Sequence, residues 1–452
     1  MRISDIIQRK IGILGFGIEG RSVLAALRRG GHSEPVHVIT REVVSVPEGV
    51  VLQLANHTLP ALPALDVIVR SPGFAPNHPL RLQLTAAGIA QTTATQLFMH
   101  EARELGASVI GITGSKGKST TSTLTHLTLE AADVPSVLVG NVGVSALDVL
   151  PRLAQERVVA VMELSSYQCA DLVPEFGPSI AALLDLFPEH LDWHGGLDAY
   201  YRAKLRIIET QRETDTAFYN EHTGELAKLL ASLPARARPM NTPQELHFQA
   251  GWFLRGSEPL FSDAGMLLPG AHNRRNAVSA LMLAECVGAQ PQHLQRVLRS
   301  FAGLPYRLQR ERSAAGIHWI NDAISTAPEA VAAALAALQP AAKVTTLIVG
   351  GQSRGLDQTV LIRALAQSSV RTLIALPDTG AQIARSARDA GLTLQLREVE
   401  ELAEAVQLAA ASTAAGETCL YSPGAPSYNR YSSFQERGAL FRKLLDELDP
   451  GA

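Results

Sequence analysis

The run from Gly111 to Thr120, GITGSKGKST, combines the residue types that bind a nucleoside triphosphate. Its glycines free backbone N–H groups to surround phosphate oxygens, Lys118 can bridge those oxygens, and the Ser119 hydroxyl can reach Mg²⁺. The loop is contracted, because the first glycine of the general pattern GxxxxGK[ST] would stand at position 112, which is isoleucine. It still follows an apolar run and precedes a helix-like one, which is the context that a phosphate-binding turn needs.

A second glycine-rich turn, Gly15 to Gly20, has the pattern GxGxxG after a short apolar run. A dinucleotide site would also need an acidic residue at the end of the next strand. That strand ends with Ile39, Thr40 and Arg41, and the first acid, Glu42, comes too late. We therefore favour a nucleotide or sugar-nucleotide diphosphate over a nicotinamide cofactor. The tripeptide 71–73, SPG, would face the same crevice, although it would also form a plain turn.

Three further positions could bind metal. Glu163 directly follows the apolar run VVAVM, where open α/β sheets bind ligands, although a carboxylate there could equally cap a helix or form an ion pair. His190 and His194 have the spacing of zinc ligands, but no HExxH motif accompanies them and no third ligand is evident. A Mg²⁺ site that accepts one imidazole is the simpler interpretation.

The elements that must position these residues form three blocks. Short apolar runs alternate with helix-period segments, which is typical of parallel sheets with crossover helices. At 452 residues the chain also exceeds the length at which a single core stops growing. We expect an α/β protein with domains at 1–95, 96–303 and 304–452, the second ending in hairpins around residues 248–261.

The composition indicates a globular protein that works on small molecules. Hydrophobic residues make up 46%, charged residues 18%, and the net charge is −3, so no basic excess suggests a nucleic-acid partner. No apolar run is long enough to span a bilayer, and the N-terminus lacks a signal-peptide pattern. Cys169, Cys286 and Cys419 form no CxxC pair, so we expect them to be reduced and buried. We expect a cytoplasmic monomer.

Taken together, these motifs resemble the Mur ligases, the ATP-dependent amide-forming enzymes of peptidoglycan precursor synthesis. The branch with the greatest resemblance adds glutamate to UDP-N-acetylmuramoyl-L-alanine. The resemblance rests on the following segments of all three blocks: TGSKGKST (113–120), GNVG (140–143), ELSSYQ (163–168), HLDWHG (190–195), AKLRI (203–207), AHNRRN (271–276), GLPYR (303–307), IND (320–322), SPGAPS (422–427) and SSFQERG (432–438). It implies a Rossmann-like first domain, a central ATPase-type domain with a mostly parallel sheet, and a Rossmann-like third domain.

The resemblance also implies roles for the matched residues. Lys118 and Ser119 would bind the phosphates and a first Mg²⁺ ion together with Glu163, while His190 and Lys204 would bind a second Mg²⁺, Lys204 as a carbamate formed with CO₂. The other ATP-binding positions would be Gly114, Ser115, Lys116, Gly117, Thr120, Asn273, Asn276, Arg307 and Asp322. The UDP-sugar would lie on Gly17, Ile18, Glu19, Gly20, Ser71, Pro72, Gly73 and Asn141, and the amino acid on Thr326, Arg354, Ser427 and Phe434.

Departures from the D-glutamate-adding enzymes favour their L-glutamate-adding sub-branch. Ile324 replaces a lysine that follows the motif aspartate, and Arg354 replaces the lysine of a GGxxKG segment. Arginine keeps the positive charge but changes reach and geometry. Glu19 replaces the usual threonine of the first glycine turn, and Ile39 stands where an acid can follow the second strand.

Four alternatives stay open on the sequence: the D-glutamate-adding ligase, a folylpolyglutamate synthase, an NAD-dependent dehydrogenase and a non-catalytic nucleotide-binding module. The first block argues against the folate enzyme, which lacks a UDP-binding domain. Retention of the following six residues argues against a non-catalytic module: Lys118, Glu163, His190, Lys204, Arg307 and Asp322.

Overall fold

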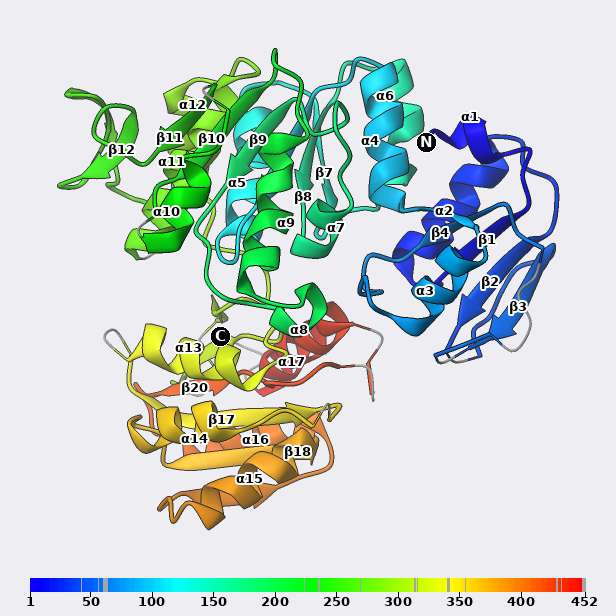
Figure 1. Ribbon diagram of the computed structural model, residues 1–452. Helices are drawn as coiled ribbons and strands as arrows, with labels where there is room; N and C mark the ends of the chain where they lie inside the picture. The colour runs from blue at the N-terminus through cyan, green and yellow to red at the C-terminus, as the bar shows by residue number, and fades with distance from the viewer. Residues whose placement is uncertain are drawn as a thin grey trace. The chain divides into compact units, whose positions relative to one another are not determined.

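The computed structural model describes residues 1–41, 43–55, 57–59, 64–222, 224–234, 236–268, 270–312, 314, 316–339, 342–353, 355–427, 430–431 and 433–448. Glu42 and Arg354 lie outside these ranges. The chain divides into two compact units, Met1–Phe301 and Ala302–Ala452 (Figure 1). The first unit contains both glycine-rich turns. Because this division places no boundary inside Met1–Phe301, the boundary expected near residue 95 stays a prediction.

The first unit begins with a five-stranded parallel sheet of order β3-β2-β1-β4-β5. Its elements are α1 (Ile3–Ile6), β1 (Ile11–Leu14), α2 (Ile18–Arg29), β2 (Val36–Thr40), β3 (Val50–Leu54), β4 (Val67–Arg70), α3 (Pro79–Ala86), β5 (Ala90–Thr92) and α4 (Ala94–Glu104). Every residue of β1 and β4 is buried, as expected for strands covered on both faces. The loops after these central strands carry the GxGxxG and SPG turns.

A second sheet of the same unit has six parallel strands in the order β11-β10-β9-β6-β8-β7. Its strands are β6 (Val109–Thr113), β7 (Ser136–Gly140), β8 (Val159–Glu163), β9 (Ile180–Leu183), β10 (Thr216–Asn220) and β11 (Ala237–Met240). The helices are α5 (Lys118–Ala131), η1 (Ala146–Asp148), α6 (Leu150–Gln155), α7 (Ser166–Ala170), α8 (Leu191–His194), α9 (Leu197–Glu209), α10 (Gly224–Leu230), α11 (Ala271–Glu285) and α12 (Pro291–Leu298). The segment expected to form hairpins is the antiparallel sheet β12 (Leu246–Gln249), β13 (Trp252–Arg255) and β14 (Glu258–Ser262).

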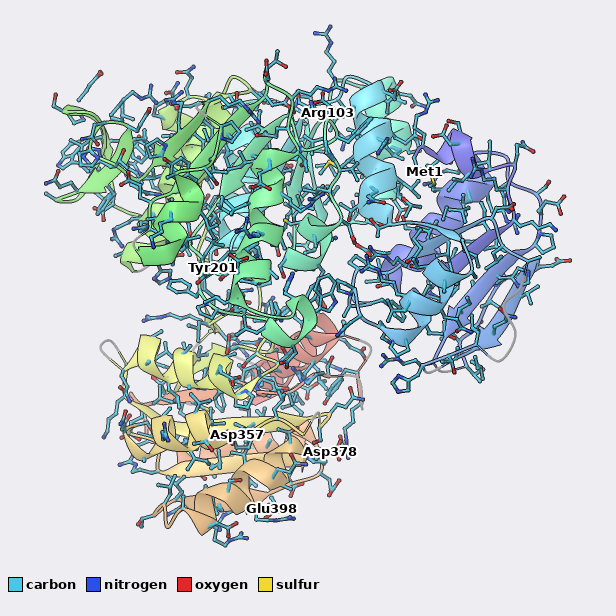
Figure 2. All side chains as sticks on the ribbon, in the orientation of Figure 1. Met1, Arg103, Tyr201, Asp357, Asp378 and Glu398 are labelled. Carbon is cyan, nitrogen blue, oxygen red and sulfur yellow. The ribbon has the colours of Figure 1, made fainter. Side chains whose placement is uncertain are left out.

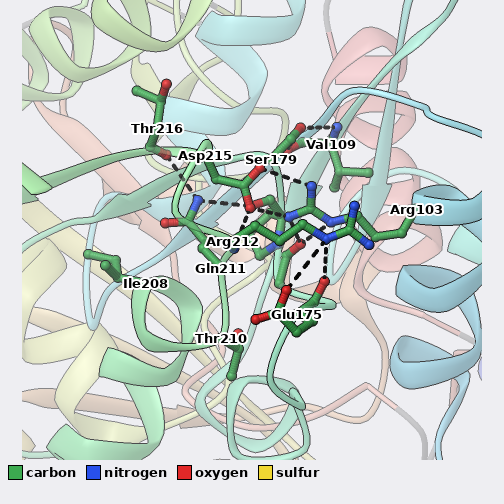
Figure 3. Close-up of polar contacts among 12 residues, drawn as sticks. Arg103, Val109, Glu175, Ser179, Ile208, Thr210, Gln211, Arg212, Asp215 and Thr216 are labelled. Carbon is green, nitrogen blue, oxygen red and sulfur yellow. Dashed lines mark hydrogen bonds and ion pairs between the residues drawn. The ribbon is translucent and has the colours of Figure 1, made fainter. Parts of the chain in front are cut away.

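Helix α4 joins the two parallel sheets into one body. One cluster of buried apolar side chains runs from Ile13 in β1 through Phe98 in α4 to Ala160 in β8. Figure 3 shows the polar end of this junction, where Arg103 of α4 donates from Nε to the Gly177 carbonyl at 2.9 Å and from Nη1 to Asp215 at 3.0 Å. Figure 2 labels Met1 on the same side of the unit, and its amino group lies 3.1 Å from the ring nitrogens of His100 in α4.

The second unit is a sheet of order β15-β16-β20-β17-β18-β19, in which only the short β15 runs antiparallel to its neighbour. Its elements are β15 (Gln309–Arg310), β16 (His318–Asn321), α13 (Pro328–Leu338), β17 (Val344–Gly351), α14 (Thr359–Ala366), β18 (Thr372–Asp378), α15 (Thr379–Asp389), β19 (Gln395–Glu398), α16 (Leu402–Ser412), β20 (Thr418–Tyr421) and α17 (Phe434–Leu448). Leu347 packs in the cluster that includes α13 and α14, and Ile348 in the one that includes α16 and α17, so helices cover both faces.

The expected α/β class with mostly parallel sheets is confirmed. The expectation for the cysteines is wrong at one position: Cys169 and Cys419 are buried, whereas Cys286, at the end of α11, is exposed. Cys286 caps the C-terminus of α11, and its thiol donates to the Met282 carbonyl at 3.3 Å. No helix in the described part of the chain has the length and apolar character to cross a membrane.

Candidate active site

The GITGSKGKST run is the turn between β6 and α5, and its glycines permit close approach of other segments. Gly117 caps α5 with a φ of 86°, a conformation that favours glycine. A Cβ at this position would lie 2.5 Å from the Asn276 Oδ1, and one at Gly114 would lie 2.7 Å from the Leu184 Cβ. The turn therefore presents its backbone at the N-terminus of α5, where the helix dipole favours phosphate.

Two lysines converge on this turn. Lys118 donates from Nζ to the carbonyls of Gly114 at 2.8 Å and Ser115 at 2.9 Å. Lys204 of α9 donates to the same Gly114 carbonyl at 2.8 Å and lies 3.3 Å from the Thr113 hydroxyl. Lys204 is only 2% exposed, and burial, followed by the charge of Lys118, lowers the pKa of its amine to about 8. A default surface lysine would not have this position or this pKa.

The side chains of Ser115 and Lys116 are engaged with other groups of the protein. The Ser115 hydroxyl lies 2.6 Å from the Tyr200 hydroxyl and donates to the Phe187 carbonyl at 2.8 Å. Lys116 forms an exposed ion pair with Glu189 at 2.7 Å. The Ser115 N–H is also engaged, since it donates to the Asp185 carbonyl at 2.8 Å, so of these side chains Lys118 is the one that offers a charge to a phosphate.

Glu163 ends β8, the strand beside β6, and its carboxylate is almost completely buried at 1% exposure. Its Oε1 accepts a hydrogen bond of 3.0 Å from the Asn141 side chain, and its backbone carbonyl accepts another from the Asn141 N–H. Its Oε2 has no hydrogen-bond partner among the described residues. A buried anionic oxygen without a donor fits a bound cation, and Mg²⁺ prefers carboxylate and hydroxyl oxygens.

His190 and His194 lie in different surroundings. His190 adopts a left-handed conformation (φ 55°) at the start of α8, its ring 5.1 Å from that of Tyr167, and burial lowers the pKa of its imidazole. The Nε2 of His194 is engaged with the Ser166 hydroxyl at 3.0 Å. Across the described ranges, no group of three or more His, Cys, Asp or Glu side chains is arranged to hold a metal. A zinc site built from both histidines is therefore not supported.

The two turns expected to bind the UDP-sugar both contact the central sheet's helices. Glu19, in the first turn of α2, accepts a hydrogen bond of 2.9 Å from Gln168 of α7. Burial raises the pKa of this carboxyl group. Ile18 is 81% exposed beside it, which leaves the start of α2 open. The SPG turn is held by Trp193, whose indole N–H donates to the Gly73 carbonyl at 3.0 Å.

A buried ion pair between Arg70 and Asp171, which the sequence analysis did not predict, also joins the first sheet to α7. Arg70, the last residue of β4 before Ser71, pairs with Asp171 at the end of α7, and both side chains are about 5% exposed or less. Gln96 also donates to the Asp171 carbonyl at 2.6 Å. An arginine at the end of an otherwise apolar buried strand was the available signal, since such a charge needs a partner.

The asparagines expected near the adenine lie at the start of α11. Asn276 donates to the side chain of Asn273 at 3.3 Å and lies against Gly117. Between them, Arg275 pairs at 2.8 Å with Asp185, which also accepts a 2.9 Å hydrogen bond from Asn220. This network joins the ends of β9 and β10 to α11 and fixes the asparagines beside the phosphate-binding turn.

The remaining expected residues belong to the second unit. Asp322 follows β16 and is 5% exposed; it accepts hydrogen bonds from the Ser422 hydroxyl at 2.7 Å and the Leu308 N–H at 3.1 Å. Burial outweighs these bonds and raises the pKa of its carboxyl group to about 6. Thr326 and Ser427 lie in the loops after β16 and β20, Phe434 begins α17, and Arg307 lies in the turn before β15.

Comparisons with known proteins cover the whole chain. A family model described as the Mur ligase middle domain matches residues 112–284, and one described as the Mur ligase glutamate ligase domain matches residues 306–424. The UDP-N-acetylmuramoyl-L-alanine–L-glutamate ligase of Salinispora tropica is 38% identical, covering 98% of this chain and 99% of that protein. The enzyme of the same name from Xanthomonas campestris pv. campestris is 35% identical, covering 100% and 98%.

A solved structure extends the likeness to the fold. The UDP-N-acetylmuramate–alanine ligase of Thermotoga maritima superposes with a TM-score of 0.60 at 16% identity, covering 97% of this chain and 99% of that one. Identity this low bears on the fold alone.

Proposed function

This chain belongs to the Mur ligase family, and we propose that it joins L-glutamate to UDP-N-acetylmuramoyl-L-alanine in an ATP-dependent step of peptidoglycan precursor synthesis. The observation that carries this function is the full-length match to relatives that bear this activity in their names. The match includes the first sheet, which a folylpolyglutamate synthase would lack. The D-glutamate-adding and dehydrogenase alternatives are not favoured.

The reaction implied by the family moves the γ-phosphate of ATP to the substrate carboxylate and then replaces it with the amine of glutamate. The first step forms a bond between the carboxylate oxygen and phosphorus and releases ADP; the second forms the amide and releases inorganic phosphate. Both steps need charge neutralisation at the phosphoryl group and alignment of the attacking atom. The Gly114–Thr120 turn supplies backbone donors, and Lys118 supplies the cation that can leave the carbonyls of Gly114 and Ser115 for a phosphate.

Glu163, Ser119 and His190 are the residues that would hold Mg²⁺ ions. The unpaired Oε2 of Glu163 and the open start of α5 support this assignment. Bound there, Mg²⁺ would neutralise phosphate charge and orient the phosphoryl oxygens. The lowered pKa of the His190 imidazole keeps that ring neutral near pH 7, the form that can donate a lone pair.

Lys204 is the residue whose environment suits a carbamate. The ammonium would first lose a proton, and the neutral amine would then attack the carbon of CO₂, form the N–C bond, open one C=O bond and lose a second proton. The two losses together convert a cation into an anion. The pKa of about 8 makes the neutral amine accessible at physiological pH, which an ordinary lysine is not. The change of charge would also replace repulsion from Lys118 by attraction.

The GxGxxG turn and the SPG turn would hold the UDP-sugar. Asn141, which donates to Glu163, would contribute to the same site. In the second unit, Arg307 and Asp322 would serve ATP, and Thr326, Arg354, Ser427 and Phe434 the amino acid. We further propose that the enzyme acts as a cytoplasmic monomer whose partners are its small-molecule substrates.

The function is tested by mass spectrometry of the product. Incubation with ATP, Mg²⁺, UDP-N-acetylmuramoyl-L-alanine and L-glutamate should yield one amide-linked adduct, and omission of ATP should abolish it. Lys118→Ala should lose turnover while remaining folded. Full turnover in this variant would overturn the assignment of the phosphate-binding turn.

A further inference from the structure

Arg437, on α17, is a buried cation, and no carboxylate among the described residues pairs with it. Its side chain is 1% exposed. Nη2 donates to the carbonyls of Ala323 at 2.8 Å and Ala425 at 3.0 Å. In the part of the chain that the structure describes, Nε and Nη1 have no hydrogen-bond partner. Burying an unpaired charge is costly, so its retention requires a reason beyond stability.

The two carbonyls bring Arg437 to the loops that would hold the amino acid. Ala323 stands three residues before Thr326 in the loop after β16, and Ala425 stands two residues before Ser427 in the loop after β20. Phe434 lies one turn earlier on the same helix as Arg437. In a parallel sheet these loops meet at one edge, the edge where open α/β sheets bind ligands.

The end of β17 also packs against the guanidinium. A Cβ added to Gly351 would lie 3.0 Å from Nη1 of Arg437 and 2.5 Å from the Pro426 carbonyl. The Gln352 N–H donates to that carbonyl at 2.9 Å, and the Gly350 N–H donates to the Pro423 carbonyl at 2.8 Å. The loops after β17 and β20 are thus bonded to each other beside Arg437.

Gly438, the next residue of α17, contacts Asn321 and Tyr306. The Gly438 carbonyl accepts a 3.0 Å hydrogen bond from Asn321, and a Cβ on Gly438 would overlap the ring of Tyr306. Tyr306 and Asn321 adjoin Arg307 and Asp322, the residues assigned to ATP. Gly438 therefore packs against the neighbours of Arg307 and Asp322, while Arg437 contacts the loops after β16 and β20.

We propose that Arg437 is a positioning residue of the acceptor site. It fixes the loops after β16 and β20 and the end of β17 relative to α17, and it places a positive charge beside a substrate that bears two carboxylates. The proposal rests on the function proposed above, since it takes L-glutamate as the acceptor. It concerns the KM for that acceptor and not the chemistry of phosphoryl transfer.

The test is steady-state kinetics of Arg437→Lys and Arg437→Gln with each of the three substrates varied in turn. Arg437→Gln should raise the KM for L-glutamate about tenfold or more, while the KM values for ATP and for UDP-N-acetylmuramoyl-L-alanine stay within about twofold. Arg437→Lys keeps the charge but loses the planar fork, so it should rescue part of the loss. Arg442→Lys is the matched control, because Arg442 lies on the same helix and pairs with Glu311 at 3.0 Å.

A KM for L-glutamate that stays within twofold in folded Arg437→Gln would overturn the proposal. So would a parallel rise of all three KM values with a lowered melting temperature, since a purely structural role predicts that pattern. If Arg437→Gln does not fold, the same criteria apply to Arg437→Lys. Failure of the proposed function is recognised separately, because the unsubstituted enzyme would then show no phosphate release that depends on L-glutamate.

Discussion

Replacement of Lys204 by methionine should stabilise the first unit at pH 7 while abolishing turnover. Burial and Lys118 lower the pKa of Lys204 from 10.5 to about 8, so the folded protein holds a protonated amine at a cost when the pH is below 8. Each pKa unit corresponds to about 1.4 kcal/mol, which gives about 3 kcal/mol in total. Loss of the hydrogen bonds to Gly114 and Thr113 offsets part of this. The expected net gain in unfolding free energy is about 1–3 kcal/mol.

The cost of burying Lys204 depends on pH in a direction that follows from its lowered pKa. Below pH 8 the amine is protonated in both the folded and the unfolded chain, and the full cost is present. Between about pH 8 and 10.5 the folded form is neutral and the unfolded form is charged, so the cost falls as the pH rises. The stability gap between Lys204→Met and the unsubstituted protein should therefore be largest at pH 7 and close to zero above pH 10.5.

The assay is urea unfolding followed by tryptophan fluorescence in CO₂-free buffer at pH 7 and above pH 10.5. The first unit contains Trp193 and Trp252, and a Trp319→Phe background shared by both proteins removes the signal of the second unit. An equal gap at both pH values, or a methionine variant that is less stable at pH 7, would refute the reasoning. A second experiment adds bicarbonate to the same unfolding assay. Bicarbonate should stabilise the protein with Lys204 and not Lys204→Met, and equal stabilisation of the two proteins would contradict the carbamate.

Two further predictions follow from buried charges. Arg70→Met should lower the unfolding free energy of the first unit by about 3–5 kcal/mol, because it leaves Asp171 buried without its partner. The double variant Arg70→Met with Asp171→Leu should lose clearly less unfolding free energy. Equal losses for the two variants in urea unfolding would contradict a buried pair. Asp322→Asn should stabilise the second unit at pH 8 by about 1–3 kcal/mol, because a carboxyl group with a pKa raised to about 6 is disfavoured as the anion above that pH. That gain should vanish below pH 3.8, as read from Trp319 fluorescence, and a gain that persists in acid would exclude carboxylate burial as its cause.

The sequence predicted the central strands of each sheet because they are continuous apolar runs. Strands VHVIT, VAVME and IAAL appear within the runs that indicated them. The strands not predicted lie mostly at or next to sheet edges. β3 and β19 are partly or largely exposed, so they lack a continuous apolar signal, and β5 and β15 contain only three and two residues. The resemblance to the Mur ligases is confirmed by the comparisons, and the relatives found are named as L-glutamate-adding ligases.

The candidate site was predictable where chemistry depends on local sequence, and not where it depends on long-range contacts. The phosphate-binding turn could be recognised from ten consecutive residues. Glu19 and Gln168 are 149 residues apart, and Arg70 and Asp171 are 101 apart, so no local pattern pairs them. The burial that lowers the pKa of Lys204 likewise comes from the packing of α9 against α7 and β9, with its amine at the end of β6. Arg437 stood in a recognised motif, but its contacts appear only once three loops meet.

The most direct test of the function is phosphate release from ATP and Mg²⁺ in the presence of UDP-N-acetylmuramoyl-L-alanine. It is measured with L-glutamate, with D-glutamate and with neither. We predict release with L-glutamate alone, which would establish both the ligase activity and the acceptor. Release with D-glutamate alone would contradict the assigned acceptor, and no release with either enantiomer would contradict the ligase function itself.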